Sequence, residues 1–491
     1  MYMDYDWILR YALNDENFYL VYTMKTWLFI FRQDLRIIDN VWFAQACREC
    51  EQVIPLFVLD TEAFSRFPDD DPRQWFQREA LRFLESDIAD IGWQLYVAHG
   101  PADQEISKIL ETHEIDAVYL NRSYGHGSVT RDKKLQELCE NIWVTYMQCT
   151  DYLMLEIDVV ETRKVFTPFF KKRLPRVQEK YHAGEYTIKT PTKISTPNLP
   201  LPTLQDHQDK ITYHSHPVWK VEWIRERLAS LTLTDYDTTR NLPADTTGTT
   251  KLSPYLTFGI LWPREVFGQF VKHMSTQDGY PAEKNRADVV VSELAWREFW
   301  QHISYRFPAT TYDKYEAFQD KRKWIVWENN EERFEKRKNG TTGYPIVDAG
   351  MRQLKAENRM HNRVRMIVAS FLTKDLLIDW RRWEKHFADL LIDYDRNVNI
   401  WNRQRSASVW ADPKPLRIFN PILQSGRYDP LAEYILRRVP ELKWQPIPAI
   451  HDPIKYVLDY HTPIVDHYVW SKIARQRYNE AKAEYQKWVE K

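Results

Sequence analysis

The sequence predicts an α/β N-terminal domain with a doubly wound parallel sheet, followed by an all-α C-terminal domain. Buried-strand patterns alternate with helical patterns early in the chain, and strand patterns nearly vanish after residue 216. The chain has 491 residues, enough for two or three domains, and its 43% hydrophobic content is typical of a globular protein.

Four strand-like runs lie in the N-terminal domain, which we expect over residues 24–155. They read "TWLFIFRQDLRI" (26–37), "QVIPLFVLD" (52–60), "QLYVAHG" (94–100) and "DAVYLNRSYG" (116–125). Helical segments separate them, so the sheet should be parallel, with ligand sites at the carboxyl ends of its strands. Residues 1–23 precede Met24, which is the better start, and are expected to be a disordered or mis-annotated extension.

The Pro-, Thr- and Lys-rich stretch 156–215 predicts an interdomain linker. Residues 216–491 carry helical apolar spacing, which predicts a helical domain. There is no run of 18 apolar residues and no secretory signal. The four cysteines lack the spacing of a metal site, so we expect reduced thiols, no metal and a cytoplasmic protein. No obligate protein partner is evident, and we expect a monomer.

The net charge of the chain limits which partners it can attract. Lys and Arg total 68, and Asp and Glu total 69, so any nucleic-acid binding requires a local basic surface. "MHNRVRM" (360–366) is one candidate, although alone it reads as a solvated, basic helix start.

The segment "GTTKLSPYLTFG" (248–259) is a candidate phosphate site. Thr249, Thr250 and Ser253 stand before a helix that Pro254 can begin. Hydroxyls and free N–H groups at a helix start suit a phosphate or pyrophosphate, and they equally suit an ordinary N-cap.

Two further segments place polar groups on helices. In "SELAWREFWQH" (292–302), Glu293 and Trp296 share one helix face and could stack a base and hold its edge, as could an ordinary amphipathic helix pattern. In "LLIDYDRNVN" (390–399), Asp393 and Asp395 usually mark a helix end, and no His or Cys cluster supports a metal there.

Together these segments resemble the DNA photolyase/cryptochrome family, most closely the class I cyclobutane pyrimidine dimer photolyases. The resemblance covers about residues 24–445 and includes "FIFRQDLRIIDN", "NRSYGHGSVTRD", "TTGYPIVDAGMRQL", "MHNRVRMIVASFLTKDLLIDW" and "RIFNP". It implies an antenna-binding α/β domain, a helical domain that binds FAD, and UV-damaged DNA as the partner. A second antenna chromophore of folate or deazaflavin type fits the family, but the sequence does not choose between them.

The resemblance also implies a set of cofactor contacts. These are Tyr236, Thr249, Thr250, Lys251, Leu252, Ser253, Arg365, Asp393, Tyr394, Asp395 and Asn399. Asp393 would meet the isoalloxazine edge and pair with Arg365. Asn399 would face flavin N5, where a neutral amide can hydrogen-bond a protonated nitrogen without adding charge.

Lesion and DNA contacts follow from the same resemblance. They are Glu293, Trp296, Arg297, Asn362, Arg363, Met366 and Arg405. A flipped-out thymine dimer would stack on Trp296 and bond to Glu293, and reduced, light-excited FAD would lend it an electron. The (6-4) photolyases carry a histidine pair where this chain has only His361, which favours cyclobutane dimers.

The chain departs from the family at its electron relay. Trp380 and Trp327 match the middle and outer members of a three-tryptophan relay that rereduces the flavin. The flavin-proximal member aligns with Arg403, and a lesion-contacting Trp aligns with Arg405. An arginine cannot relay a hole as Trp does, so photoreduction of a chain with Arg403 should be slow.

These departures form a pattern. Arg359 also stands where relatives have Trp, whereas Trp383, Trp401 and Trp410 stand where relatives favour Gly. The chain has 20 Trp and only 13 Gly, against roughly 34 Gly at average usage. One hypothesis is that the cell reads UGA as Gly and CGG or CGA as Trp, so that the printed residues differ from the native ones. The other is a truly divergent protein.

Two alternatives to repair follow from the same residues. A cryptochrome-like blue-light sensor would share the fold and FAD. A light-inactive protein that binds damaged DNA would suit Arg403 and Arg405 as phosphate contacts.

Overall fold

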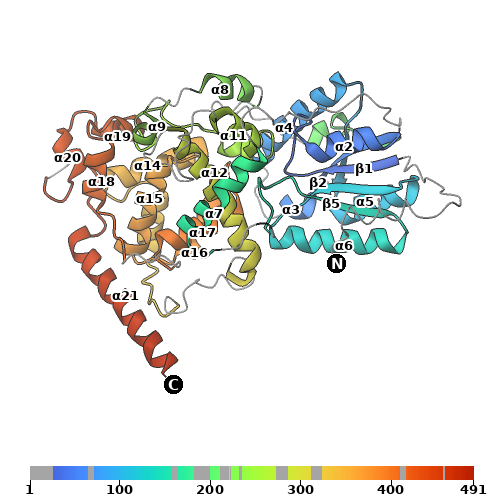
Figure 1. The fold of residues 1–491 in the computed structure, drawn as a ribbon. Helices are drawn as coiled ribbons and strands as arrows, with labels where there is room; N and C mark the ends of the chain where they lie inside the picture. The colour runs from blue at the N-terminus through green and yellow to red at the C-terminus, as the bar shows by residue number, and fades with distance from the viewer. Residues whose placement is uncertain are drawn as a thin grey trace, which may run out of the picture.

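The computed structural model has a sheet domain and a helical domain (Figure 1). It describes residues 26–64, 71–157, 159, 163–181, 199–210, 221, 223–231, 235–271, 286–310, 323–409, 416–456 and 459–490. The predicted extension 1–23 and Trp410 lie outside these residues.

The sheet has five parallel strands in the order β3-β2-β1-β4-β5. The strands are β1 (Thr26–Phe31), β2 (Gln52–Asp60), β3 (Tyr96–Gly100), β4 (Ala117–Asn121) and β5 (Thr145–Cys149). The predicted doubly wound sheet is confirmed, and β5 is a fifth strand that the sequence analysis missed. "TYMQC" mixes polar and apolar residues and is only half-buried at this sheet edge, so it lacks the continuous apolar run of the other strands.

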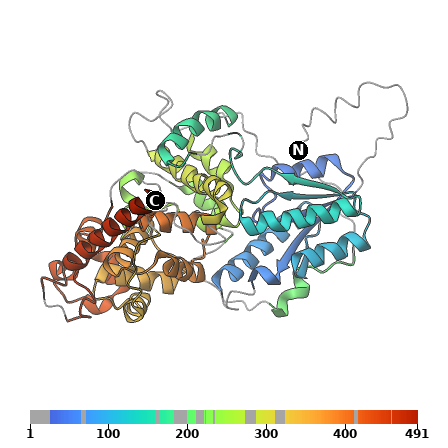
Figure 2. The same ribbon diagram turned by 90° about the horizontal axis from the view of Figure 1, so that it is seen from below.

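Helices cover both faces of this sheet (Figure 2). They are α2 (Val41–Glu49), α3 (Thr61–Phe64), α4 (Pro72–Asp90), α5 (Ala102–Thr112) and α6 (His126–Asn141). Alternate side chains of β1 serve opposite cores: Phe29 packs with α2 and α4, and Leu28 packs with α5 and α6. This two-sided burial explains why the central strands read as unbroken apolar runs.

The helical domain follows a connection that is itself partly helical. Within the predicted linker 156–215 lies α7 (Phe166–Lys180), which packs on α12 through the buried Arg173–Glu298 ion pair. The remaining α-helices are α8 (Ile224–Ser230), α9 (Tyr236–Thr239), α10 (Ser253–Thr257), α11 (Pro263–Val271), α12 (Arg286–Arg306), α13 (Glu331–Lys338), α14 (Pro345–Glu357), α15 (Asn362–Ser370), α16 (Trp380–Leu390), α17 (Arg396–Ser406), α18 (Pro421–Tyr428), α19 (Glu433–Arg438), α20 (Ile447–His451) and α21 (His467–Val489). Short 3-10 turns occur at Gln205–Lys210, Pro308–Thr310 and Pro440–Leu442, and a π-helical turn, Phe371–Asp375, extends α15.

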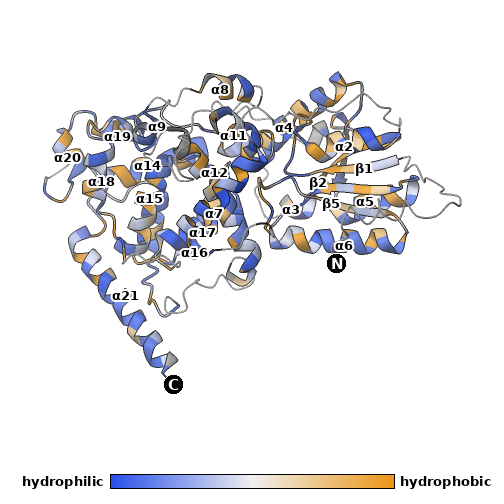
Figure 3. Cartoon of the chain, in the orientation of Figure 1, coloured by the Kyte–Doolittle hydropathy of each residue, from blue (hydrophilic) through white to orange (hydrophobic). Residues whose placement is uncertain are grey.

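Hydrophobic and hydrophilic residues alternate around most of these helices (Figure 3), as burial on one side requires. In the described ranges, no helix is long and apolar enough to cross a membrane.

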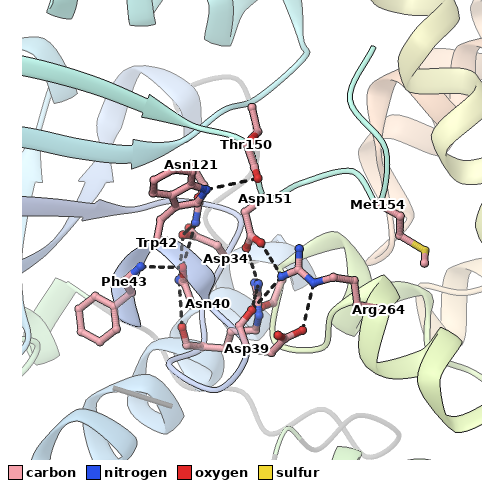
Figure 4. Close-up of polar contacts among 12 residues, drawn as sticks. Asp34, Asp39, Asn40, Trp42, Phe43, Asn121, Thr150, Asp151, Met154 and Arg264 are labelled. Carbon is pink, nitrogen blue, oxygen red and sulfur yellow. Dashed lines mark hydrogen bonds and ion pairs between the residues drawn. The ribbon is translucent and has the colours of Figure 1, made fainter. Parts of the chain in front are cut away.

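A buried polar cluster joins the two domains (Figure 4). Asp151, which follows β5, accepts hydrogen bonds from Arg36 at 2.6 Å and from Arg264 of α11 at 2.5 Å. Arg264 also bonds Asp39 at 3.2 Å. Burial raises the pKa of Asp151, and the two guanidiniums oppose that rise. The cluster fixes the helical domain against the carboxyl ends of the strands.

Candidate flavin and DNA site

The loop before α10 is a tight turn organised by Asp245. Its Oδ1 accepts hydrogen bonds from the backbone N–H groups of Thr247 at 2.8 Å and Gly248 at 2.9 Å. A Cβ at Gly248 would lie 2.7 Å from Asp245 Oδ2 and 2.8 Å from the Thr239 carbonyl oxygen, so only glycine fits. The turn thereby presents Thr249 and Thr250 in fixed positions.

Three cations gather around this loop. Arg227 donates hydrogen bonds to the carbonyls of Thr250 and Thr249 at 2.8 and 3.1 Å, and Arg359 donates to Thr249 Oγ1 at 3.1 Å. Burial, with repulsion from Arg359 and Arg227, lowers the pKa of Lys251 to about 8. A cationic cluster with neighbouring hydroxyls is the donor set that a pyrophosphate requires, so these residues fit the diphosphate of FAD.

Asp393 links this loop to α15. Its carboxylate accepts a hydrogen bond from Ser253 Oγ at 2.7 Å and two from Arg365 Nη2 at 2.9 and 3.1 Å. Burial alone would raise the pKa of Asp393, but the ion pair and hydroxyl outweigh it and hold the pKa below its usual value. Asp393 is therefore ionised at neutral pH. The structure contains the Asp393–Arg365 pair that the resemblance implies.

A pocket opens between α15, the 391–395 turn and α17. It encloses about 470 Å³, open solvent included, and is lined by Asn362, Arg365, Met366, Leu391, Asp393, Tyr394, Asp395, Val398, Asn399, Asn402, Arg403 and Ser406. The lining includes residues predicted for the cofactor and residues predicted for the lesion. One cavity thus brings together part of each predicted set: Asn362 and Met366 of the lesion set, and Arg365, Asp393, Tyr394, Asp395 and Asn399 of the cofactor set.

Asn399 sits in this pocket within a chain of hydrogen bonds. Its Nδ2 donates to Glu384 Oε1 at 3.4 Å, and Tyr394 Oη donates to the same oxygen at 2.6 Å. Arg403 Nε and Nη2 donate to Asn399 Oδ1 at 3.0 and 2.9 Å. The chain fixes the orientation of the Asn399 amide and places a cation on its oxygen. Sequence reasoning missed Glu384, because a single acid in "RRWEKHF" carries no distinctive signal.

The other predicted cofactor residues have mainly structural contacts. Leu252 is buried in the core beside α10. Asp395 caps α17 by accepting a hydrogen bond from Val398 N at 3.1 Å, and its other oxygen accepts one from Gln301 at 2.7 Å. Tyr236 donates a hydrogen bond to Glu293 at 3.1 Å.

Glu293 and Trp296 lie on α12, as their spacing predicts. Glu293 pairs with Arg240, which the sequence analysis did not single out. The ring of Trp296 stacks on Phe166 of α7 with centroids 3.6 Å apart and a 7° interplanar angle, and the Arg405 guanidinium lies 4.5 Å from its centroid. Both neighbours cover this ring, so a base can stack on Trp296 only if one of them moves.

Arg297 of α12 contacts an aromatic ring. Its guanidinium lies 4.4 Å from the ring centroid of Tyr152, next to the sheet domain. Its predicted contact to DNA stays a prediction.

Basic side chains border the pocket at α15. Arg363 donates to Asn241 at 2.5 Å and lies 4.2 Å from the Tyr428 ring centroid, and its Nη1 is 3.7 Å from Met366 Sδ. Asn362 begins the same helix. Arg363 thus places positive charge beside Met366, which lines the pocket.

The two predicted relay tryptophans belong to one cluster. Trp380 begins α16 and is buried, and Trp327 packs at the cluster edge with its ring centroid 6.4 Å from that of Tyr478. Arg403 lies on α17 between Ile400 and Ala407, which belong to this cluster, and its guanidinium is 3.9 Å from the ring centroid of Trp383.

Comparisons with known proteins match this geometry. A family model described as DNA photolyase matches residues 27–189, and one described as FAD binding domain of DNA photolyase matches residues 290–480. A deoxyribodipyrimidine photo-lyase from Synechococcus is 34% identical over 93% of this chain and 97% of its own length.

Two solved structures share the fold. One is an archaeal photolyase from Sulfolobus tokodaii with two FAD molecules, with a TM-score of 0.81, 30% identity, and coverage of 93% of this chain and 100% of that one. The other is a bacterial class III photolyase from Agrobacterium tumefaciens, with a TM-score of 0.81, 30% identity, and coverage of 94% and 98%. Similarity to a class III structure leaves the class I prediction untested.

Proposed function

Because the chain belongs to the DNA photolyase family, we propose that it repairs cyclobutane pyrimidine dimers in UV-damaged DNA in a light-dependent reaction. The observation that carries the proposal is the shared pocket. Arg365, Asp393 and Asn399 line it with groups suited to a flavin ring, and Asn362 and Met366 line it with groups suited to a damaged base.

The protein side chains supply binding and orientation in this reaction. The cationic loop at 249–251 would hold the diphosphate, and the ionised Asp393 would accept hydrogen bonds from the ring system. Asn399, held by Glu384 through its amide nitrogen, would border the ring. When bound and reduced, FAD supplies an electron to the excited-state reaction and takes it back, so no side chain acts as a nucleophile.

Glu293 recognises the lesion in this proposal. Its carboxylate lies at the surface of α12, paired with Arg240, and both side chains remain partly exposed. A flipped-out dimer can therefore reach it at modest cost, because a damaged base pair is already weakened. Arg363 and its basic neighbours hold the backbone, so binding should weaken with salt.

The test combines two measurements on FAD-loaded, chemically reduced protein. Binding to an oligonucleotide with one thymine dimer is measured in the dark, and loss of the dimer is measured after illumination. We expect binding and light-dependent loss, with Glu293→Gln weakening both and the dimer surviving in the dark.

Other outcomes distinguish the alternatives. Binding without light-dependent loss would support a damage-binding protein, and neither binding nor loss would support a light sensor. Repair of a (6-4) lesion but not of a dimer would contradict the proposed substrate. Chemical reduction matters, because it bypasses the relay in which Arg403 stands.

A further inference from the structure

Two arginines are buried in the helical domain, and neither forms an ion pair with another described residue. The side chain of Arg337 in α13 is 0% exposed, and its Nε, Nη1 and Nη2 have no hydrogen-bond partner among the described residues. Burial lowers its pKa to about 9. Arg403 is 3% exposed, and its hydrogen bonds to described residues go to the neutral Asn399. Burial with repulsion from Arg365 lowers its pKa strongly, although the Glu384 carboxylate opposes that shift.

Such positions do not suit a guanidinium. Buried charges in folded proteins are normally paired and hydrogen-bonded, because an isolated ion costs several kcal/mol to remove from water. Neither arginine has an ion pair within the described part of the chain. What surrounds them is aromatic: Arg403 lies 3.9 Å from the ring centroid of Trp383 and 4.3 Å from that of Phe387.

Trp383 lies near both arginines, and its indole N–H is buried without an acceptor among the described residues. Its ring is 0% exposed. The Arg337 guanidinium lies 5.6 Å from its centroid. The Trp383 indole thus fills space beside both guanidiniums, into which a larger aromatic side chain at 337 or 403 would extend. Glycine at 383 would vacate that space, so the three positions are coupled.

Trp143, in the sheet domain, is a second tryptophan at a position that suits glycine. It follows the end of α6, where Val144 N bonds Cys139 O at 2.9 Å and Trp143 N bonds Glu140 O at 3.4 Å. These bonds define a Schellman motif with Trp143 at its left-handed position, φ +61°, where glycine is the usual residue. The side chain is 96% exposed. A bulky residue is strained in this conformation and gains nothing from packing there.

We propose that the polypeptide made in its native cell carries tryptophan at 337 and 403 and glycine at 143 and 383, because that cell decodes the corresponding codons differently. Two reassignments are sufficient: an arginine codon read as Trp, and UGA read as Gly instead of Trp. The physical misfits fall into these two exchanges. Buried, unpaired guanidiniums become aromatic, and Trp is replaced where the backbone or the neighbouring space requires glycine.

The direct test is peptide mass spectrometry of the protein purified from its native cells. We expect Trp masses at 337 and 403, Gly masses at 143 and 383, and no trypsin cleavage after 337 or 403. Arginine at 337 or 403, or tryptophan at 143 or 383, would overturn the proposal. The gene sequence adds a second check, because an ordinary UGG codon at Trp143 or Trp383 would contradict it.

Recombinant full-length protein tests the coupling by thermal unfolding. We expect the triple variant R337W/W383G/R403W to melt well above the printed sequence, whereas R403W alone should melt lower because Trp383 blocks its indole. A printed sequence that melts as high as the triple variant would remove the physical basis. Trp143→Gly should raise the melting temperature, and Trp143→Ala, which also removes the ring but keeps a Cβ, should raise it less. Equal effects of Gly and Ala would show that backbone strain is absent.

Discussion

The substitution Asp393→Asn tests how much the ion pair in the pocket contributes. Asparagine has nearly the same shape and lacks the charge, so Arg365 would lose the carboxylate that holds it. The side chain of Arg365 is 20% exposed and that of Asp393 is 6% exposed, so little water replaces the lost interaction. Breaking a buried pair costs about 3–5 kcal/mol, and the partial exposure of Arg365 favours the lower end, about 3 kcal/mol.

This cost is measurable by thermal unfolding of the FAD-free protein. At about 2–4 °C per kcal/mol for a domain of roughly 150–250 residues, the melting temperature should fall by about 6–12 °C. Asp389→Asn is the matched control, because it removes an exposed pair with Lys385 whose side chains are 77% and 41% exposed. Such pairs contribute about 0–1 kcal/mol. Equal melting temperatures for Asp393→Asn and the control would refute the reasoning.

The same variant has a predicted pH signature. The folded-state pKa of Asp393 lies below its ordinary value, so the pair stabilises the fold above about pH 4 and loses that contribution as pH falls through the folded-state pKa. Asp393→Asn should therefore remove part of the acid-side decline in stability. An unchanged acid-side profile would mean that the pair does not stabilise the folded state.

Three further predictions concern the loop and the domain junction. FAD affinity should fall by up to about tenfold per pH unit above pH 8, because Lys251 has a pKa of about 8 and loses its charge. Fluorescence titration with FAD should show a weaker pH dependence of affinity for Lys251→Met. An affinity that does not change with pH in the unaltered protein would contradict a role of Lys251 in binding the diphosphate. Gly259→Ala should abolish expression of soluble protein, because Gly259 has a φ of +68° and a Cβ there would lie 1.9 Å from Gln33 O. Gly268→Ala is the control and should be neutral or stabilising, because a Cβ at Gly268 would have no atom within 4 Å. Equal expression of the two variants would contradict this prediction. Arg264→Met leaves Asp151 with one of its two guanidiniums, which should lower the free energy of unfolding by about 3 kcal/mol. Calorimetry should then show the two domains unfolding in separate transitions. A single transition at the unaltered temperature would show that the cluster does not couple the domains.

Local patterns were sufficient to predict the two domains. Continuous apolar runs in β1 and β2 are what two-sided burial requires, and the helical domain follows from 3.6-residue periodicity. The edge strand β5 was missed because its half-buried residues carry no such run. In the predicted linker, Pro175 and the basic residues obscured α7.

The site was predictable only where a motif carried it. The Asp393–Arg365 pair followed from the family resemblance, and the structure contains it. By contrast, Arg36 and Asp151 meet across 115 positions of the chain, and no local pattern in the sequence indicates such a contact. The buried, unpaired state of Arg337 was also invisible, because "RFEKRK" reads as an exposed basic helix until the fold buries one of its residues.

The residue at position 403 decides what Asn399 can do. With arginine there, both hydrogen bonds from the guanidinium fall on Asn399 Oδ1, the acceptor that a protonated flavin N5 would require. The cation also lies among the residues that line the pocket, where Arg365 already balances Asp393. With tryptophan there, Oδ1 is free, and Glu384 still anchors the amide through Nδ2. The proposed repair reaction and the proposed decoding therefore both depend on whether Asn399 Oδ1 is free to accept a hydrogen bond. A protein with Trp at 403 and Gly at 383 should offer reduced FAD a free amide oxygen at Asn399, whereas in the printed sequence Arg403 occupies that oxygen.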